Sequence, residues 1–207
     1  MSADMVFKNW IEIIRQFAES IDKSLRHLKP YYTMLSDTII ITCECNISNI
    51  NTIFQSLIQP FIHSIDLDFF LRGTISYGMT FISPRLILGP AIDDAAEGHN
   101  ILEWIGIATT PNLSAYYLGN GYEKKTDNYS YYPTIPVKKV EYNNKEFSPR
   151  YFRRKGYYEG LALKLIDENH DLRQLLTNKR NSHTKLEVKG KYENTLAFLD
   201  YCEKNRN

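Results

Sequence analysis

Two charged side chains stand where a ligand-binding or metal-binding site could use them. Asp37 follows Ser36 between two short apolar stretches, so a turn is expected there that exposes the carboxylate above a sheet. That carboxylate could bind a divalent cation, or it could simply cap the turn. Arg72 opens a second apolar stretch, where a cation needs a partner. The partner could be a phosphate or base of a ligand, or an acidic neighbour such as Asp66 or Asp68.

Two further side chains share a side of the chain with Asp37. Tyr31 and Thr33 follow the same alternation along a predicted strand, so all three side chains can face one pocket. Tyr31 and Thr33 could contact a ligand there, or they could be ordinary residues on the surface of a sheet.

The spacing of apolar residues predicts the elements that would position these side chains. A helix with a stripe from Trp10 to Leu28 ends at Pro30. The next stretch is rich in Ile, Thr and Tyr and predicts two strands joined at Ser36 and Asp37. The following expected elements are a helix capped by Ser48 and kinked at Pro60, strands over 69–82 and 86–88, a helix from Gly89, and a strand over 105–109.

Beyond Thr110 the pattern is weaker. It predicts a long loop over 111–136, an edge strand at 135–137, a helix over 158–176 and a closing helix over 191–202. We expect one α+β domain over 1–207, with a core over about 1–110 and a C-terminal α/β extension over about 111–207.

Composition narrows the class of protein. The net charge of +1 indicates no nucleic-acid-binding surface, so we expect no nucleic-acid partner. The apolar runs are far shorter than the roughly 20 residues that cross a bilayer, so we expect no membrane partner. The cysteines are Cys43, Cys45 and Cys202, which form no CxxC pair and favour a reducing cytoplasm.

Three segments carry a resemblance to a known family. They are residues 34–41 (MLSDTIII), residues 71–78 (LRGTISYG) and residues 89–97 (GPAIDDAAE). Their order and spacing resemble the class III nucleotide cyclases. The second and third segments are most similar to the pyrimidine branch, whose members make cyclic UMP or cyclic CMP in the Pycsar antiphage systems. The resemblance covers about residues 29–109.

The resemblance implies a fold, a reaction and site residues. The fold would be a ferredoxin-like cyclase core that forms homodimers with active sites between the subunits. The reaction would convert UTP or CTP to its 3′,5′-cyclic monophosphate and pyrophosphate with two divalent ions, Mn²⁺ or Mg²⁺. Asp37 would be a metal ligand, Arg72 a catalytic residue that stabilises charge on the transferred phosphate, and Tyr31 and Thr33 nucleotide-binding residues.

The sequence also departs from the family pattern. The family core begins with a strand that carries a first metal-binding Asp, and here we expect that strand to be missing, since residues 3–7 (ADMVF) resemble it only faintly. Asp93 and Glu97 occupy the positions where the family has Asn and Arg. The alternative is therefore a catalytically degenerate nucleotide-binding or dimerisation module.

Overall fold

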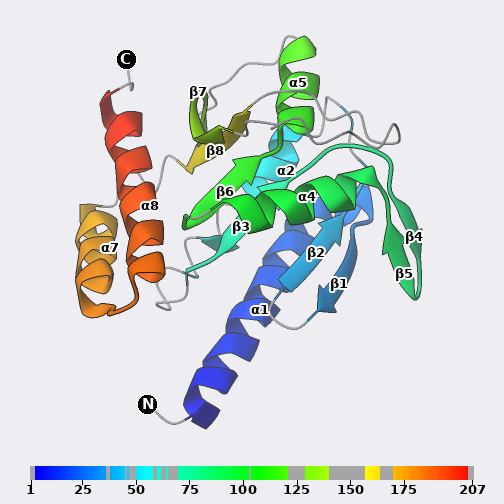
Figure 1. The fold of residues 1–207 in the computed structure, drawn as a ribbon. Coiled ribbons are helices and arrows are strands. Elements are labelled where there is room, and N and C mark those ends of the chain that lie inside the picture. Colours follow the sequence, from blue (N-terminus) through cyan, green and yellow to red (C-terminus); the bar gives the residue numbers. More distant parts are fainter. Residues whose placement is uncertain are drawn as a thin grey trace. The chain divides into compact units, whose positions relative to one another are not determined.

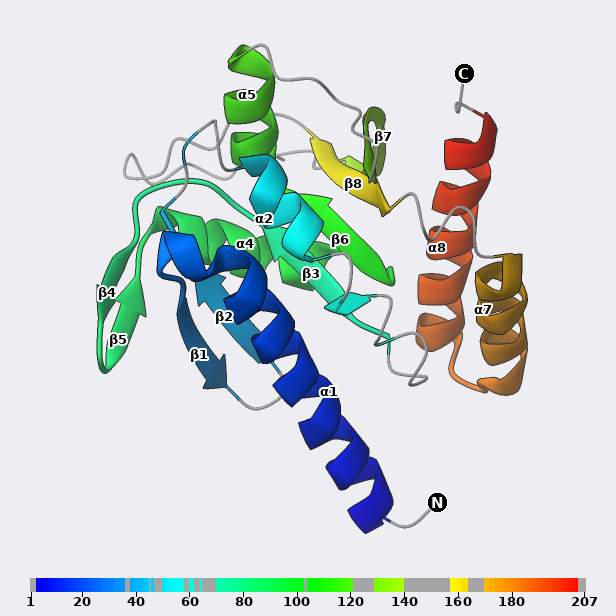
Figure 2. The same cartoon turned by 180° about the vertical axis from the view of Figure 1, so that it is seen from behind.

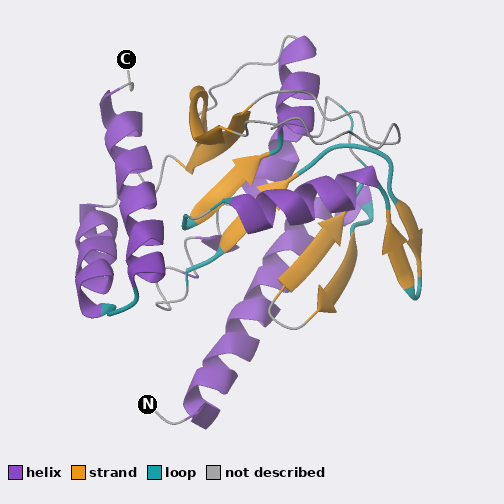
Figure 3. Ribbon diagram, in the orientation of Figure 1, coloured by secondary structure: helices purple, strands orange, loops and turns teal. Residues whose placement is uncertain are grey.

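The chain forms helices and small sheets in a computed structural model that describes most of its length (Figures 1 and 3). The described residues are 3–35, 38–44, 46, 50–57, 60–61, 64, 70–102, 104–120, 129–139, 157–163 and 170–204. They belong to two compact units, residues 1–71 and 72–207, which we describe one at a time. The mixture of helices with mainly antiparallel strands confirms the α+β class.

The first unit holds a long helix and a β-hairpin. Its elements are α1 (Ala3–Leu25), the 3-10 turn η1 (Arg26–Leu28), β1 (Tyr31–Leu35), β2 (Thr38–Thr42) and α2 (Ile50–Ser56). The predicted helix and hairpin are confirmed. Residues 3–7 lie at the start of α1, so they form helix and not a strand.

Apolar side chains of α1 and α2 form the core of this unit. Ile13 and Leu25 of α1 are buried, as are Ile50 and Phe54 of α2, and the two helices contact each other. This burial explains the apolar stripe, because an amphipathic helix gains most of its stability from packing that face.

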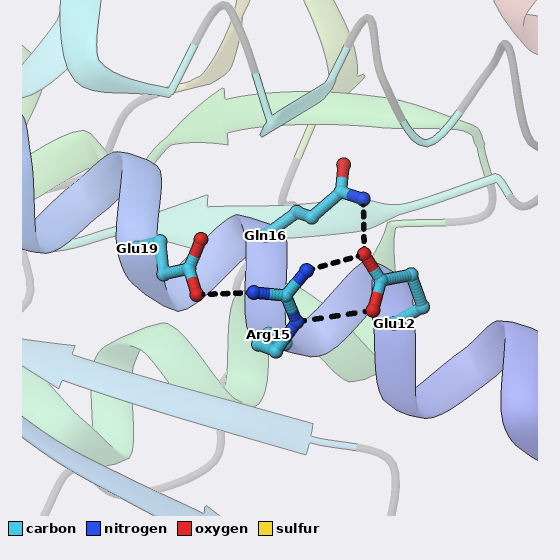
Figure 4. A network of polar contacts seen from close by, with 4 residues as sticks. All are labelled: Glu12, Arg15, Gln16 and Glu19. Atoms are coloured by element: carbon cyan, nitrogen blue, oxygen red, sulfur yellow. Dashed lines mark hydrogen bonds and ion pairs between the residues drawn. The ribbon is translucent and has the colours of Figure 1, made fainter.

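The solvent-facing side of α1 carries an ion-pair network (Figure 4). Arg15 binds both carboxylate oxygens of Glu12, at 2.6 and 3.0 Å, and one oxygen of Glu19 at 2.6 Å. The amide of Gln16 donates to Glu12 at 2.5 Å. The hydrogen bond to Glu12 is the main reason that the pKa of Arg15 is raised. These are neighbours three and four positions apart on an exposed helix, so we assign them to helix stability and not to a site.

The second unit is built on a four-stranded sheet in the order β3-β6-β8-β7. Its strands are β3 (Arg72–Ile75), β6 (Gly106–Thr109), β7 (Tyr129–Lys139) and β8 (Tyr157–Leu163). β3 and β6 are parallel, with Ile75 opposite Thr109, whereas β8 is antiparallel to both β6 and β7. The connection from β3 to β6 passes through the hairpin of β4 (Phe81–Ser83) and β5 (Leu86–Leu88) and then through α4 (Pro90–Ile101). Such a crossover is what a parallel pair requires.

Helices pack around this sheet. α4 contacts β3, and α5 (Pro111–Gly119) contacts β8. α7 (His170–Ser182) and α8 (Leu186–Lys204) contact each other, and α8 also contacts β7 and β8 (Figure 2). Thr195 of α8 accepts a hydrogen bond from the backbone N–H of Ile105 at 2.8 Å. The rings of Trp104 and Phe198 pack edge to face, with centroids 5.0 Å apart, so the C-terminal helix is part of the core.

Three sequence predictions in this unit were wrong. The strand expected over 69–82 is two short strands, because β3 ends at Ile75 and β4 begins at Phe81. The start of the loop expected over 111–136 is helix α5, since Pro111 occupies a first helical position that tolerates proline. The start of the helix expected over 158–176 is strand β8, which pairs with β6 and β7. Among the described residues, no helix has the length and apolar character to cross a membrane.

Candidate functional site

Tyr31 and Thr33 lie on β1 of the first unit. They are opposite Thr42 and Ile40 of β2, so these four side chains share one face of the hairpin. The hydroxyl of Thr42 is buried and has no hydrogen-bond partner in the described part of the chain. This face therefore combines an aromatic ring and hydroxyl groups, which suits a contact with a polar, planar ligand.

Tyr32 lies on the opposite face of the same hairpin. Burial raises the pKa of its phenol, and the negative charges of Asp22 on α1 and of Cys43 add to the shift. Its buried hydroxyl has no partner among the described residues. Because successive side chains of a strand point to opposite faces, Tyr32 is directed away from the face that carries Tyr31 and Thr33.

Asp37, the predicted metal ligand, lies outside the described residues. The register of the hairpin pairs Leu35 with Thr38, the residues on either side of Ser36 and Asp37. In the described part of the chain, no group of three or more His, Cys, Asp or Glu side chains could hold a metal ion.

Arg72, the predicted catalytic residue, lies at the start of β3 in the second unit. Its Nη1 donates to the carbonyl oxygen of Leu102 at 3.1 Å, and its Nη2 lies 3.2 Å from Nε2 of His99. Because a guanidinium only donates, Nε2 of His99 must be the acceptor. Both partners lie at the C-terminal end of α4, where a positive charge complements the helix dipole. The acidic partners considered from the sequence, Asp66 and Asp68, lie outside the described residues.

One face of β3 is polar along its whole length. Arg72, Thr74 and the following Ser76 alternate onto the same side, and the first and last of them bind α4. The hydroxyl of Thr74, between them, is buried without a partner in the described region. Since Arg72 binds the end of α4 and Ser76 binds its first half, the helix runs antiparallel to the strand.

A buried carboxylate joins the elements at the carboxyl ends of β3 and β6. Asp94 on α4 is 4% exposed, and its Oδ2 accepts from Ser76 Oγ at 2.8 Å and from Asn112 Nδ2 at 3.2 Å. Thr110, after β6, is 3.4 Å from Ser76 through their hydroxyls, and its N–H donates to Ile75 O at 2.9 Å. This cluster of Ser76, Asp94, Thr110 and Asn112 is named here the Asp94 network.

An aromatic pair lies next to the Asp94 network. The ring of Tyr77, which follows Ser76, stacks on that of Tyr116 on α5, with centroids 3.9 Å apart and planes inclined by 17°. The carboxyl ends of parallel strands are a common location for binding sites in sheets of this type. The arrangement thus places polar and aromatic groups together, although within the network the hydrogen-bonding groups already satisfy one another.

The sequence analysis did not identify the Asp94 network. Ser76 lies within segment 71–78 and Asp94 within segment 89–97, where the family resemblance singles out Arg72, Asp93 and Glu97. A usable signal was present, because helical spacing puts Asp94 on the same side of the helix as Ala91, Gly98 and Ile101, none of which is polar. An acidic side chain on a buried face requires partners, and hydroxyl and amide side chains provide them.

Removing the Asp94 carboxylate should destabilise the second unit. Asp94→Ala removes the acceptor shared by the part-buried donors of Ser76 and Asn112 and leaves a space where the carboxylate was, so we expect a loss of about 2–4 kcal/mol in the free energy of unfolding. Asp94→Asn keeps an acceptor oxygen in the same place and should lose less than about half as much. Urea unfolding followed by circular dichroism measures both.

The neighbouring residue provides the matched control. Asp93 is exposed in the first turn of α4, and Asp93→Ala should cost about 0.3–1 kcal/mol through the helix dipole alone. If Asp94→Ala were no more harmful than Asp93→Ala, the network would have no structural role.

Comparison with models of known protein families, with curated proteins and with solved structures found no match to this chain.

Proposed function

We propose that this chain is a pyrimidine nucleotide cyclase, which converts UTP or CTP to 3′,5′-cyclic UMP or cyclic CMP and pyrophosphate. The product would be a second messenger in antiphage defence, made in the cytoplasm by a homodimer with a ferredoxin-like class III cyclase core. The proposal rests on the resemblance of residues 34–41, 71–78 and 89–97 to that family.

One structural observation supports the proposal, because two of these segments pack against each other. Segment 71–78 contains β3, and segment 89–97 contains the first half of α4. The two are joined by the 2.8 Å hydrogen bond from Ser76 to Asp94 and by the packing of α4 on β3. Segments that resemble parts of one active site in sequence therefore lie against each other in space.

Arg72 has the role of stabilising the transferred phosphate in this proposal. In the reaction, the 3′-oxygen bonds to the α-phosphorus and the bond from that phosphorus to the leaving pyrophosphate breaks, so negative charge grows on the phosphate oxygens. Two of the N–H groups of Arg72 bind Leu102 and His99, which fixes the guanidinium in place. Its remaining N–H groups have no partner in the described residues and can donate to a phosphate.

Tyr31 and Thr33 have the role of contacting the base. Their common face on β1 offers a ring for stacking and a hydroxyl that can donate or accept a hydrogen bond. Because a hydroxyl can both donate and accept a hydrogen bond, these groups suit the edge of uracil and the edge of cytosine alike.

Divalent ions, Mn²⁺ or Mg²⁺, enter the proposal through the resemblance alone. When bound, such ions activate the attacking hydroxyl and neutralise the phosphates. The described residues do not form a metal site by themselves, and the proposed ligand Asp37 lies outside them.

A second candidate is a catalytically degenerate nucleotide-binding or dimerisation module. The specific observation in its favour is that Arg72 already binds the C-terminal end of α4, which is a structural role. In addition, Glu97 carries a negative charge where the family has Arg, and a carboxylate cannot stabilise a phosphate anion.

Incubation of the purified chain with each of the four labelled nucleoside triphosphates and Mn²⁺ tests the proposal. We expect a cyclic monophosphate from UTP or CTP and none from the purine triphosphates. Binding of UTP or CTP without product would favour the degenerate module. Cyclic AMP or cyclic GMP as the product would contradict the assignment to the pyrimidine branch.

The variant Asp37→Ala should abolish this activity and leave the fold intact. Loss of one turn aspartate costs at most about 1 kcal/mol of stability, whereas loss of a metal ligand removes the ion. Product formation and thermal melting, measured on the same preparation, separate the two effects. Product formed at the wild-type rate would contradict the assignment of Asp37 as a metal ligand.

A further inference from the structure

The turn between α7 and α8 carries a concentration of positive charge. Residues 179–191 contain one acidic side chain, Glu187, and five basic ones, which are Lys179, Arg180, Lys185, Lys189 and Lys191. The net charge of this segment is therefore +4, whereas that of the whole chain is +1, so the rest of the chain is net negative. The overall net charge does not reveal such a local surface.

Packing beneath the turn holds it in place. α7 and α8 contact each other and lie side by side in both views, joined by this turn (Figures 1 and 2). Leu176 of α7 and Tyr192 of α8 are buried. The ring of His183, in the turn, stacks on that of Tyr192 with centroids 5.5 Å apart, and Nε2 of His183 lies 3.4 Å from the Tyr192 hydroxyl. The basic residues are thus carried by a packed pair of helices.

The positions of two of the lysines are unfavourable for the fold. Lys185 directly precedes α8, and Lys189 lies one turn further on, so both charges are near the end of the helix where the dipole is also positive. They are four positions apart on one face of the helix, where like charges repel. Neither lysine forms an ion pair with another described residue.

The basic residues of α7 have a different explanation. Lys179 and Arg180 lie in the last turn of that helix, where a positive charge complements the dipole. Helix stability therefore accounts for these two residues but not for Lys185 and Lys189. A surface that keeps lysines at a cost to its own helix is one that a negatively charged ligand would stabilise.

An exposed apolar side chain identifies the kind of ligand. Leu186, which directly follows Lys185, is 82% exposed, and the segment 179–191 contains no Phe, Tyr or Trp. Single-stranded nucleic acids bind through aromatic rings on which their bases stack, and a duplex offers mainly charged and polar groups of its backbone. An anionic lipid surface suits both features of the turn, because its headgroups attract lysine and an apolar side chain can enter the boundary with the acyl chains.

We propose that the turn between α7 and α8, residues 179–191, binds peripherally to an anionic membrane surface, with Leu186 inserted among the headgroups and Lys185 and Lys189 against the lipid phosphates. Such binding requires no membrane-spanning helix. The expectation of no membrane partner was based on the length of the apolar runs, which bears on spanning alone. The inference does not depend on the proposed function, and its test requires no nucleotide.

Co-sedimentation of the full chain with vesicles tests the proposal. We expect binding to vesicles of equal parts phosphatidylcholine and phosphatidylglycerol, and none to vesicles of phosphatidylcholine alone. The binding should weaken as the salt concentration rises, because salt screens exposed charges. Lys185→Ala/Lys189→Ala should bind about twentyfold more weakly, since each basic residue at an anionic surface contributes about fivefold. Leu186→Ser should bind about tenfold more weakly, through the loss of apolar burial.

The matched control removes the same charge from another part of the chain. Lys8 and Lys23 are exposed on α1, so Lys8→Ala/Lys23→Ala should bind the anionic vesicles as the wild type does. The melting temperature of Lys185→Ala/Lys189→Ala should not fall, because that variant removes a like-charge pair from the start of a helix. Weaker binding by this variant would then report the loss of the surface and not a loss of folding.

Several outcomes would overturn the proposal. They are a wild type that does not bind the anionic vesicles at low salt, equal binding to both kinds of vesicle, and equal weakening by the control variant. Tighter binding to a single-stranded or double-stranded oligonucleotide than to the anionic vesicles would show that the ligand is a nucleic acid instead.

Discussion

Arg72→Ala should lower the turnover of UTP or CTP by about a hundred- to a thousandfold. Loss of one donor that stabilises charge in a transition state typically has an effect of that size, and Glu97 stands where the family has a cation on α4. Product formation under saturating triphosphate and Mn²⁺ measures the effect. The same substitution removes the bonds to Leu102 and His99, so we also expect a loss of about 1–3 kcal/mol in stability.

Two further variants separate the catalytic role of Arg72 from its structural role. His99→Ala removes one partner of the guanidinium but keeps its charge, so it should lower the melting temperature and retain most of the turnover. Arg72→Lys keeps the charge without the planar fork, so partial turnover is expected. An Arg72→Ala protein that is folded and fully active would exclude the catalytic role. If that protein does not fold, Arg72 is primarily the residue that holds the C-terminal end of α4.

Gly89→Ala should destabilise the protein by about 3–5 kcal/mol or prevent its folding. Gly89 precedes α4, and its carbonyl accepts from the N–H groups of Ile92 and Asp93 at 3.0 and 3.2 Å. Its φ of 141° lies in a region that side chains rarely adopt, and a Cβ would lie 2.4 Å from the carbonyl oxygen of Met79. The strained backbone conformation and the clash with the Met79 carbonyl both lower the free energy of unfolding. Neither effect can be relieved by moving a side chain.

The matched control for Gly89 is a glycine in open space. Gly190 lies within α8, and a Cβ there would meet nothing within 4 Å. Gly190→Ala should therefore raise the free energy of unfolding by about 0.5–1 kcal/mol through helix propensity. Urea unfolding of both variants gives the comparison. Equal effects of the two substitutions would contradict the conformation assigned to Gly89.

Local sequence signals were sufficient for the long helix and the hairpin of the first unit and for α4 of the second unit. The stripe of α1, the β1–β2 hairpin and the helix that begins after Gly89 were predicted, because each depends on periodicity and turn chemistry within a few residues. The prediction that Tyr31 and Thr33 lie on one strand and face one side of it is confirmed. The roles of these residues, of Arg72 and of Asp37 in cyclase chemistry remain predictions from the resemblance.

Contacts between distant parts of the chain decided the elements and the polar contacts that local signals did not predict. Residues 157–163 have the apolar content of a helix, but they form strand β8 because β6 and β7 provide hydrogen-bond partners on both sides. The Asp94 network brings together residues 18 positions apart in the chain, and Arg72 binds Leu102, which is 30 positions away. No local pattern encodes such pairings. The sequence by itself thus determined α1, the β1–β2 hairpin and α4, whereas only the tertiary structure decided the partners of each buried polar group, because those partners are chosen by packing and not by spacing along the chain.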